Sequence, residues 1–153
     1  MKKLSYSIKI QEQPQHVYDN MLGLKSKKTY NEWTAAFNPT STYEGSWNKG
    51  DKIKFIGVDE DGKAGGMLSR IAENKPGSFV SIEHYGMVQD GKEIISGEKV
   101  DKWAGAHENY RFEPTDKGTL LSVEVDTEEA YVDYFEKTWP AALEKLKDIC
   151  EGK

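Results

Sequence analysis

The stretch TEEAYVDYFEKTWPAALEKLKDIC, residues 127 to 150, decides the fold of this chain. At 1.5 Å per residue, a helix over the whole stretch would be roughly 36 Å long, enough to cross a small sheet. We expect Thr127 to be its N-cap, Glu128 and Glu129 to lie in its first turn, and Gly152 to end it. Its apolar residues recur at intervals of three and four, which predicts one buried helix face formed by Tyr131, Tyr134, Phe135, Trp139, Ala142, Leu143, Leu146, Ile149 and Cys150.

Pro140 lies inside this stretch, although an interior proline removes one hydrogen bond of a helix and clashes with the preceding turn. The apolar spacing continues unchanged across it. At about 100° per residue, Pro140 lies opposite the apolar face, on the solvent side. The sequence therefore predicts one kinked helix and not two separate helices.

The composition is typical of a soluble globular protein, and we expect a single domain over residues 1–153. The net charge is −5 and there is no basic cluster, which argues against nucleic-acid binding. No apolar run approaches the roughly 20 residues of a membrane span, and the polar N-terminal residues do not have the pattern of a signal peptide. A single cysteine, Cys150, permits no internal disulfide. Together these features predict a cytoplasmic protein.

The chain before the long helix reads as a strand, two short helices and a run of about six strands. Residues 4 to 10 alternate in the period of a half-buried strand. Pro14 suits the first turn of a helix that Gly23 ends, and a second short helix is expected over Ser26 to Trp33. From Thr42 onward the pattern is that of antiparallel strands.

Turn residues and alternating apolar residues divide this strand region. Asp61-Gly62 and Asp90-Gly91 are the pairs favoured in two-residue hairpin turns. Residues 92 to 106 read as a short strand followed by a loop. The groups expected to share a strand face are Met67, Ser69 and Ile71; Val80, Ile82 and His84; Glu108, Tyr110 and Phe112; and Leu121, Val123 and Val125.

A twisted antiparallel sheet with one apolar face must cover that face, and the C-terminal helix is the only element long enough to do so. The predicted fold class is α+β: a curved antiparallel sheet of about six to seven strands wrapped around a long kinked C-terminal helix, with two short helices after strand 1. Such a sheet touches the helix best at its ends. A cleft is therefore expected between them, and clefts of this kind are usual small-molecule sites.

The chain contains 4 Trp, 8 Tyr and 5 Phe residues, several of them on predicted inner faces. They can form a plain aromatic core or line a cavity, and the two interpretations are compatible. Trp47 and Trp103 stand beside glycines in predicted loops, where side chains more often contact ligands.

The sequence contains no recognised catalytic or metal-binding motif. His16, His84 and His107 are too scattered for a metal triad, although His84 and His107 could meet across neighbouring strands near Glu83 and Glu108. Cys150 lies in the last turn of a helix, where the dipole disfavours a thiolate. We therefore predict a protein that is not an enzyme and has no cofactor and no metal.

Several short motifs resemble, in their order along the chain, the SRPBCC or START-like superfamily. Within it the chain is most similar to the bacterial branch named after the C-terminal domain of the activator of the heat-shock protein 90 ATPase. The motifs are Trp33 with Phe37 and Pro39, EGSWNKG at 44–50, Pro76, HYG at 84–86, WAGAHENY at 103–110, GTL at 118–120 and FEKTWPAALEKLK at 135–147.

This resemblance implies a helix-grip fold with a cavity between sheet and helix that in many relatives holds an apolar molecule. It transfers no catalytic residues, because relatives on one fold differ widely in function. We expect non-enzymatic binding of a small, mostly apolar ligand, with the residues Trp33, Phe55, His84, Glu108, Tyr110, Phe135 and Trp139 contributing to the site. The alternatives are a protein-interaction, co-chaperone-like module with a protein partner and an enzyme of the cyclase or hydrolase type.

Overall fold

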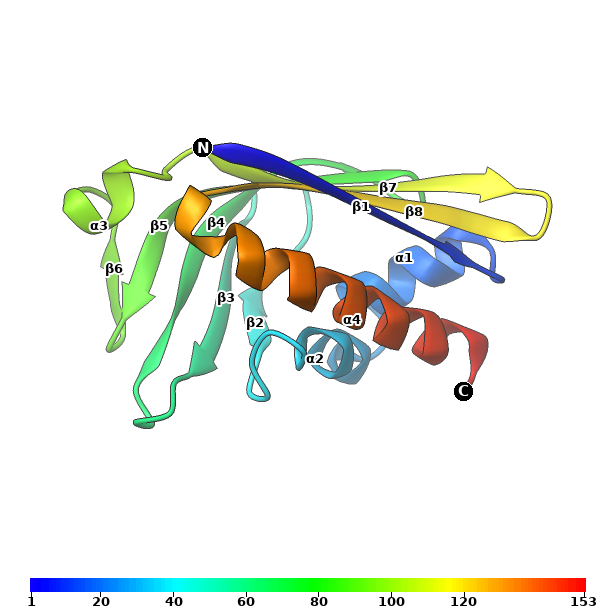
Figure 1. Cartoon of the computed structure of the whole chain (residues 1–153), viewed down its shortest axis with the longest axis horizontal. Coiled ribbons are helices and arrows are strands. Elements are labelled where there is room, and N and C mark those ends of the chain that lie inside the picture. The colour runs from blue at the N-terminus through cyan, green and yellow to red at the C-terminus, as the bar shows by residue number, and fades with distance from the viewer.

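A curved antiparallel sheet holds a long helix across its inner face in the computed structural model, which describes residues 1–153 (Figure 1). The strands are β1 (Lys2–Ile10), β2 (Thr42–Gly45), β3 (Lys52–Val58), β4 (Ala64–Lys75), β5 (Phe79–Gln89), β6 (Lys92–Ile94), β7 (Ala106–Thr115) and β8 (Gly118–Thr127). They lie in the order β1-β8-β7-β5-β4-β3-β2, with β6 paired to β5. The sheet has eight strands, where six to seven were predicted, and the short strand expected within residues 92 to 106 is β6.

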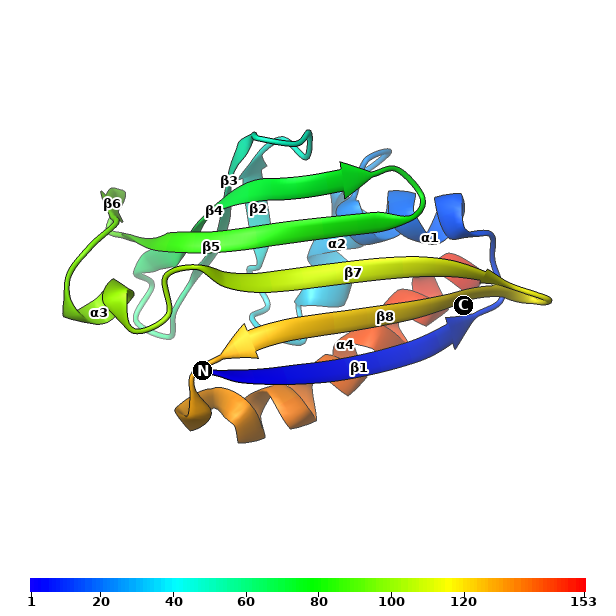
Figure 2. The same ribbon diagram turned by 90° about the horizontal axis from the view of Figure 1, so that it is seen from above.

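The longer helices lie on one side of this sheet, as the view from above shows (Figure 2). They are α1 (Pro14–Leu22), α2 (Lys27–Thr34), α3 (Glu98–Asp101), the 3-10 turn η1 (Glu129–Tyr131) and α4 (Val132–Glu151), of which α1, α2 and α4 cover the inner face. Gly23 ends α1 with a φ of 70°, which glycine adopts without steric cost. The predicted helix-grip architecture with two short helices after the first strand is confirmed. None of the helices has the length and apolar character needed to cross a bilayer.

The two predicted hairpin pairs behave differently. Asp90 and Gly91 join β5 to β6 in a two-residue turn, both with positive φ, as a type I′ turn requires. Asp61-Gly62 does not form a two-residue turn, so that prediction is wrong. Residues 59 to 63 form a longer loop in which the Asp59 carboxylate accepts hydrogen bonds from two backbone N–H groups, those of Asp61 and Lys63. This side-chain cap stabilises the longer loop.

The long helix begins four residues later than predicted, at Val132 and not directly after Thr127. Thr127 is the last residue of β8 and pairs with Lys2 of β1, so its expected role as N-cap is wrong. The ladder to β1 satisfies its backbone, and the helix starts only after the 3-10 turn. Tyr131 and Tyr134 are 53% and 44% exposed, and their predicted burial is also wrong.

Pro140 lies on the exposed side of α4 without dividing it, which confirms the prediction of one helix. The predicted kink remains a prediction. Gly152 ends the helix with a φ of 76°.

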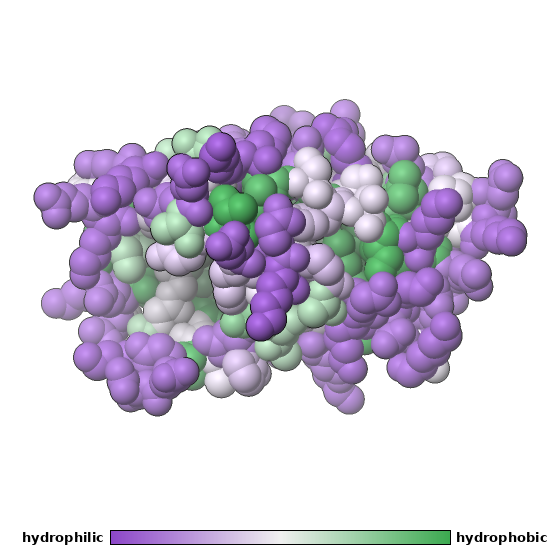
Figure 3. Space-filling model, viewed as in Figure 1, coloured by the Kyte–Doolittle hydropathy of each residue, from purple (hydrophilic) through white to green (hydrophobic).

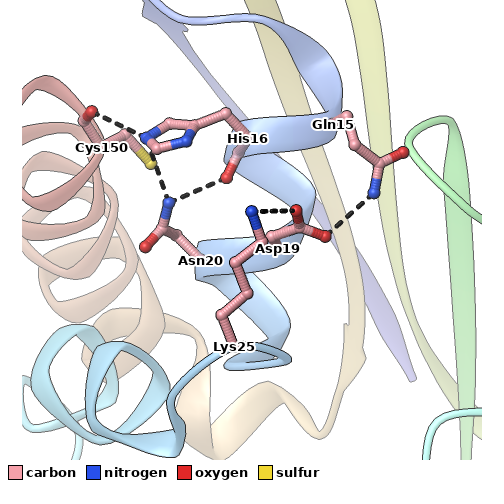
Figure 4. A network of polar contacts seen from close by, with 6 residues as sticks. All are labelled: Gln15, His16, Asp19, Asn20, Lys25 and Cys150. Atoms are coloured by element: carbon pink, nitrogen blue, oxygen red, sulfur yellow. Dashed lines mark hydrogen bonds and ion pairs between the residues drawn. The ribbon is translucent and has the colours of Figure 1, made fainter.

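One core cluster joins α1, α2 and α4 to the inner faces of most strands. Ala142, Leu143 and Leu146 of α4 are buried in this cluster together with Leu121 and Val123 of β8. In Figure 4, α1 lies beside the end of α4, where His16 Nε2 donates to the Cys150 carbonyl oxygen at 3.1 Å. This contact satisfies one of the carbonyl groups that a helix leaves free at its C-terminus.

On the same helix α1, Asp19 accepts a hydrogen bond from Gln15 at 2.9 Å and lies 3.7 Å from the ammonium of Lys25 (Figure 4). Asn20 donates to the His16 backbone carbonyl. These contacts involve exposed side chains, so we assign them a role in orienting α1 and not in binding.

The stability of this end of the molecule is expected to fall at alkaline pH because Cys150 is buried. Burial, with smaller contributions from the charges of Glu12 and Glu151, raises the pKa of the Cys150 thiol from 9.0 to about 12. As the pH rises, the unfolded chain loses this proton first. The contribution of the protonated thiol to stability is therefore complete below about pH 9 and decreases toward pH 12. Urea unfolding at pH 8 and pH 10.5 should show a loss of free energy of unfolding that is about 2 kcal/mol larger for the native sequence than for Cys150→Ala. Equal losses of stability in the native protein and in Cys150→Ala would contradict the raised pKa of this thiol.

Candidate functional site

A cavity of about 710 Å³ lies between the N-terminal half of α4 and the strands β3, β4 and β5. The helix α2 closes one side, and the chain segments 37–42 and 103–108 form part of its wall. Aromatic and aliphatic residues that line it include Tyr30, Trp33, Phe37, Phe55, Met67, Met87, Trp103, Val125, Tyr131, Tyr134, Phe135 and Trp139. This size is within the usual range of small-molecule sites.

The space-filling view shows the molecular surface hollowed on the side of β3, β4 and β5 (Figure 3). Hydrophobic and weakly polar residues occupy the hollow, and hydrophilic residues surround it. Tyr131 and Tyr134, the two exposed tyrosines of the terminal segment, belong to the cavity lining. The cavity therefore has an apolar interior that opens to solvent.

Six of the seven residues predicted for the site line this cavity. They are Trp33 of α2, Phe55 of β3, His84 of β5, Glu108 of β7, and Phe135 and Trp139 of α4. The seventh, Tyr110, is buried behind the lining, where its hydroxyl donates a hydrogen bond to Oε2 of Glu108. Tyr110 thus contacts a cavity residue and not the cavity itself.

Two residues of the cavity lining, His84 and Glu108, join two buried residues, Ser69 and Tyr110, in a set that we call the polar network. Ser69 Oγ lies 2.6 Å from His84 Nδ1, and His84 Nε2 lies 3.1 Å from Glu108 Oε1. Tyr110 donates to the other carboxylate oxygen of Glu108. Side chains of three strands, β4, β5 and β7, are therefore connected around one carboxylate.

The strand register produces this convergence. Ser69 of β4 and His84 of β5 are directly opposite each other. Glu108 of β7 pairs with Ile82, two residues before His84 on β5. A β-bulge between Leu68 and Ser69 shifts the register of β4 at this point. Bulges redirect side chains in this way beside functional sites.

The hydrogen bonds identify His84 as a donor to Glu108. A carboxylate oxygen accepts hydrogen bonds, so the proton at this contact belongs to Nε2 of His84. Ser69 is fully buried, and the His84 ring is the one partner of its hydroxyl group. This contact on Nδ1 holds the ring so that Nε2 faces the carboxylate.

The two tyrosines nearest the carboxylate remain protonated. Burial, and then the charge of Glu108, raises the pKa of Tyr110 well above its usual value of 10.0. Burial is also the main cause of the raised pKa of Tyr30, with Glu108 the second cause. Both phenols are thus neutral at physiological pH, and the one on Tyr110 is a permanent donor to Glu108.

Close packing of aromatic rings forms the apolar walls. The Phe55 ring lies edge to face with His84 at 6.0 Å and 6.2 Å from Tyr30. Trp139 contacts Phe37 at 5.0 Å and Trp33 at 5.8 Å between ring centroids. The aromatic residues therefore serve as core on one side and as cavity wall on the other.

Sequence patterns did not identify all residues of the site. Trp47, expected at a rim, is buried in the core against Tyr43 and Phe55. Trp103, expected in the same role, does line the cavity. Ser69 belongs to a predicted strand face but not to the predicted site. A regular ladder from the Lys75–Phe79 pair would place it opposite Tyr85, and a register shift between Ile71 and Glu73 pairs it with His84 instead.

The polar network contains the residue types of a hydrolytic triad, but its geometry does not favour that chemistry. Ser69 is fully buried and is not part of the cavity lining, so a molecule in the cavity does not reach its hydroxyl. His107, which could have met His84, instead lies 2.9 Å from the Gly105 carbonyl through Nδ1. No group of three or more His, Cys, Asp or Glu side chains is arranged to hold a metal ion. What the network offers to the cavity is a fixed carboxylate.

Comparison with solved structures shows the same fold in several bacterial proteins. No family model matches the chain, and no curated protein matches its sequence. The Aha1 dimer from Colwellia psychrerythraea is similar with a TM-score of 0.70 and 19% identity, over 99% of this chain and 97% of that one. An AHSA1-like protein from Aeromonas hydrophila has a TM-score of 0.71 and 15% identity, over 99% of this chain and 93% of that one. A protein from Mesorhizobium loti has a TM-score of 0.72 and 13% identity, over 99% of this chain and 98% of that one. At these identities the likeness establishes the fold, which is that of AHSA1-like proteins.

The Tyr110–Glu108 hydrogen bond is expected to stabilise the fold, because its acceptor is charged. Tyr110→Phe should lower the free energy of unfolding by about 1.5 to 3 kcal/mol. Tyr43→Phe is the matched control, since that buried hydroxyl donates to the neutral Gly23 carbonyl at 3.3 Å and should cost about 1 kcal/mol. Urea unfolding of both variants measures the difference, and a smaller loss for Tyr110→Phe than for Tyr43→Phe would refute it.

Proposed function

We propose that this protein binds a small, mostly apolar molecule in the cavity between α4 and the sheet and does not transform it chemically. The observation that carries the proposal is the cavity of about 710 Å³ with aromatic walls and one polar end. An apolar molecule gains free energy by leaving water for such walls, and a few placed polar groups orient it. The AHSA1-like fold is compatible with this role.

The fixed geometry of the cavity supports binding. Strands and helices supply most of its walls, and the polar network ties three strands together around Glu108. A preformed site binds with little cost of ordering, because its side chains are already held in place. A ligand would therefore replace water without rearranging the sheet.

A protein-interaction, co-chaperone-like role is the second candidate. The likeness to a protein named Aha1 and described as a dimer favours it. Such a role requires an exposed apolar surface. The exposed large hydrophobic residues are Met1, Leu24, Ile95, Tyr131 and Tyr134, and the last two line the cavity. The exposed aromatic side chains are thus part of the cavity lining, which favours a small molecule over a protein as the binding partner.

Binding of a neutral apolar probe tests the proposal. The fluorescence of N-phenyl-1-naphthylamine should rise and saturate with the native protein. Met67→Trp fills the cavity from β4 and should weaken probe binding at least about tenfold, because the larger side chain occupies the space of the probe. Ile95→Trp is the matched control, since Ile95 is exposed and lies outside the lining.

Fluorescence titration gives both dissociation constants, and far-UV circular dichroism verifies that each variant is folded. Equal affinity of the two tryptophan variants would mean that the probe binds elsewhere. Native mass spectrometry of the purified protein would in addition detect a natural ligand as added mass.

A further inference from the structure

The Glu108 carboxylate borders the cavity without a lysine or arginine partner. Its side chain is 22% exposed and belongs to the cavity lining. In the ion pairs of the structure its one partner is His84, whose other ring nitrogen contacts the Ser69 hydroxyl. No lysine or arginine pairs with it, in contrast to Glu93, whose carboxylate lies 2.8 Å from Lys52 and 3.2 Å from Lys54.

The carboxylate also has unused acceptor capacity. An ionised carboxylate offers about four lone-pair sites. His84 and Tyr110 use one on each oxygen. The remaining sites are available to a donor in the cavity. Both protein partners are donors, and they orient the carboxylate while leaving these sites free.

Most of the remaining charges of the cavity are also negative. The charged residues that line it, apart from the histidines, are Asp59, Lys63, Asp90, Glu108, Asp126 and Glu128. Five are acidic and one, Lys63, is basic. An anionic molecule would enter against this charge, whereas a cation would be attracted to it.

Aromatic rings lie close to the carboxylate. Phe55 packs on the His84 ring that donates to Glu108, and Tyr30 is the next ring along the wall. Tyr30 is near enough for the Glu108 charge to contribute to its raised pKa. Faces of aromatic rings attract cations, and aromatic rings together with a carboxylate form a recurring site for organic ammonium groups.

From these observations we propose that the ligand is an amine: an apolar, ring-sized body with one protonated amino group that donates to Glu108. This inference rests on the proposed function and specifies its ligand class. The body would occupy the aromatic part of the cavity toward α4, and the ammonium would lie between the carboxylate and the rings of Phe55 and Tyr30.

Three matched probes test it: 1-naphthylmethylamine, 1-naphthylmethanol and 1-naphthoate, which share one ring system and differ in charge at pH 7.5. Isothermal titration calorimetry with the native protein should give the tightest binding for the amine, about tenfold tighter than the alcohol. The naphthoate should bind weakest. Glu108→Gln should make the affinities of amine and alcohol equal, whereas Glu113→Gln, an exposed residue of the same strand, should keep the preference.

The outcomes separate this inference from the proposed function. If the native protein binds alcohol and amine equally, or prefers the naphthoate, the amine assignment is wrong, while binding of N-phenyl-1-naphthylamine would still support a ligand cavity. If the neutral probe also fails to bind, the proposed function is wrong as well. The affinities of the three probes for the native protein test the inference even if the Glu108→Gln variant does not fold.

Discussion

The packing of one helix against a sheet broader than itself determines the architecture of this protein. The C-terminal half of α4, with α1, buries its apolar face against β1, β7 and β8, where Leu121 and Val123 are fully buried. The opposite half of the sheet, β3 to β5, curves away from the helix, and α2 covers it only in part. A close-packed interior would require further side chains there. The cavity is the direct consequence of that geometry.

The polar network is the second feature that depends on the sheet. Leaving a buried polar group without a partner costs about 1 to 3 kcal/mol, so a serine, a histidine and a carboxylate under a helix are tolerated only as a connected set. Each of them finds its partner here across neighbouring strands. The same connections fix the direction of the Glu108 carboxylate. The same hydrogen bonds therefore satisfy the buried polar groups and orient the carboxylate that can bind a ligand.

Sequence patterns predicted the elements of the fold well, because local periodicity determines them. They failed where pairing between distant segments decides the outcome. Thr127 has the residue type of an N-cap, yet pairing with Lys2 extends β8 through it. Glu108 and Tyr110 share a face of β7, so periodicity alone could not tell that one reaches the cavity while the other lies behind it. The contact of Ser69 with His84 depends on the register of β4 and β5, which the shift between Ile71 and Glu73 modifies.

The terminal helix itself is divided in composition at Pro140. Before it the inward residues are aromatic, Phe135 and Trp139, and after it they are smaller aliphatic residues such as Ala142 and Leu146. Small aliphatic side chains let a helix approach a sheet closely, and such contact excludes a cavity. Large flat rings keep the two surfaces apart and present faces and edges to the space between them. The helix therefore carries two functions along one face: its C-terminal half stabilises the fold, and its N-terminal half holds the cavity open above Glu108.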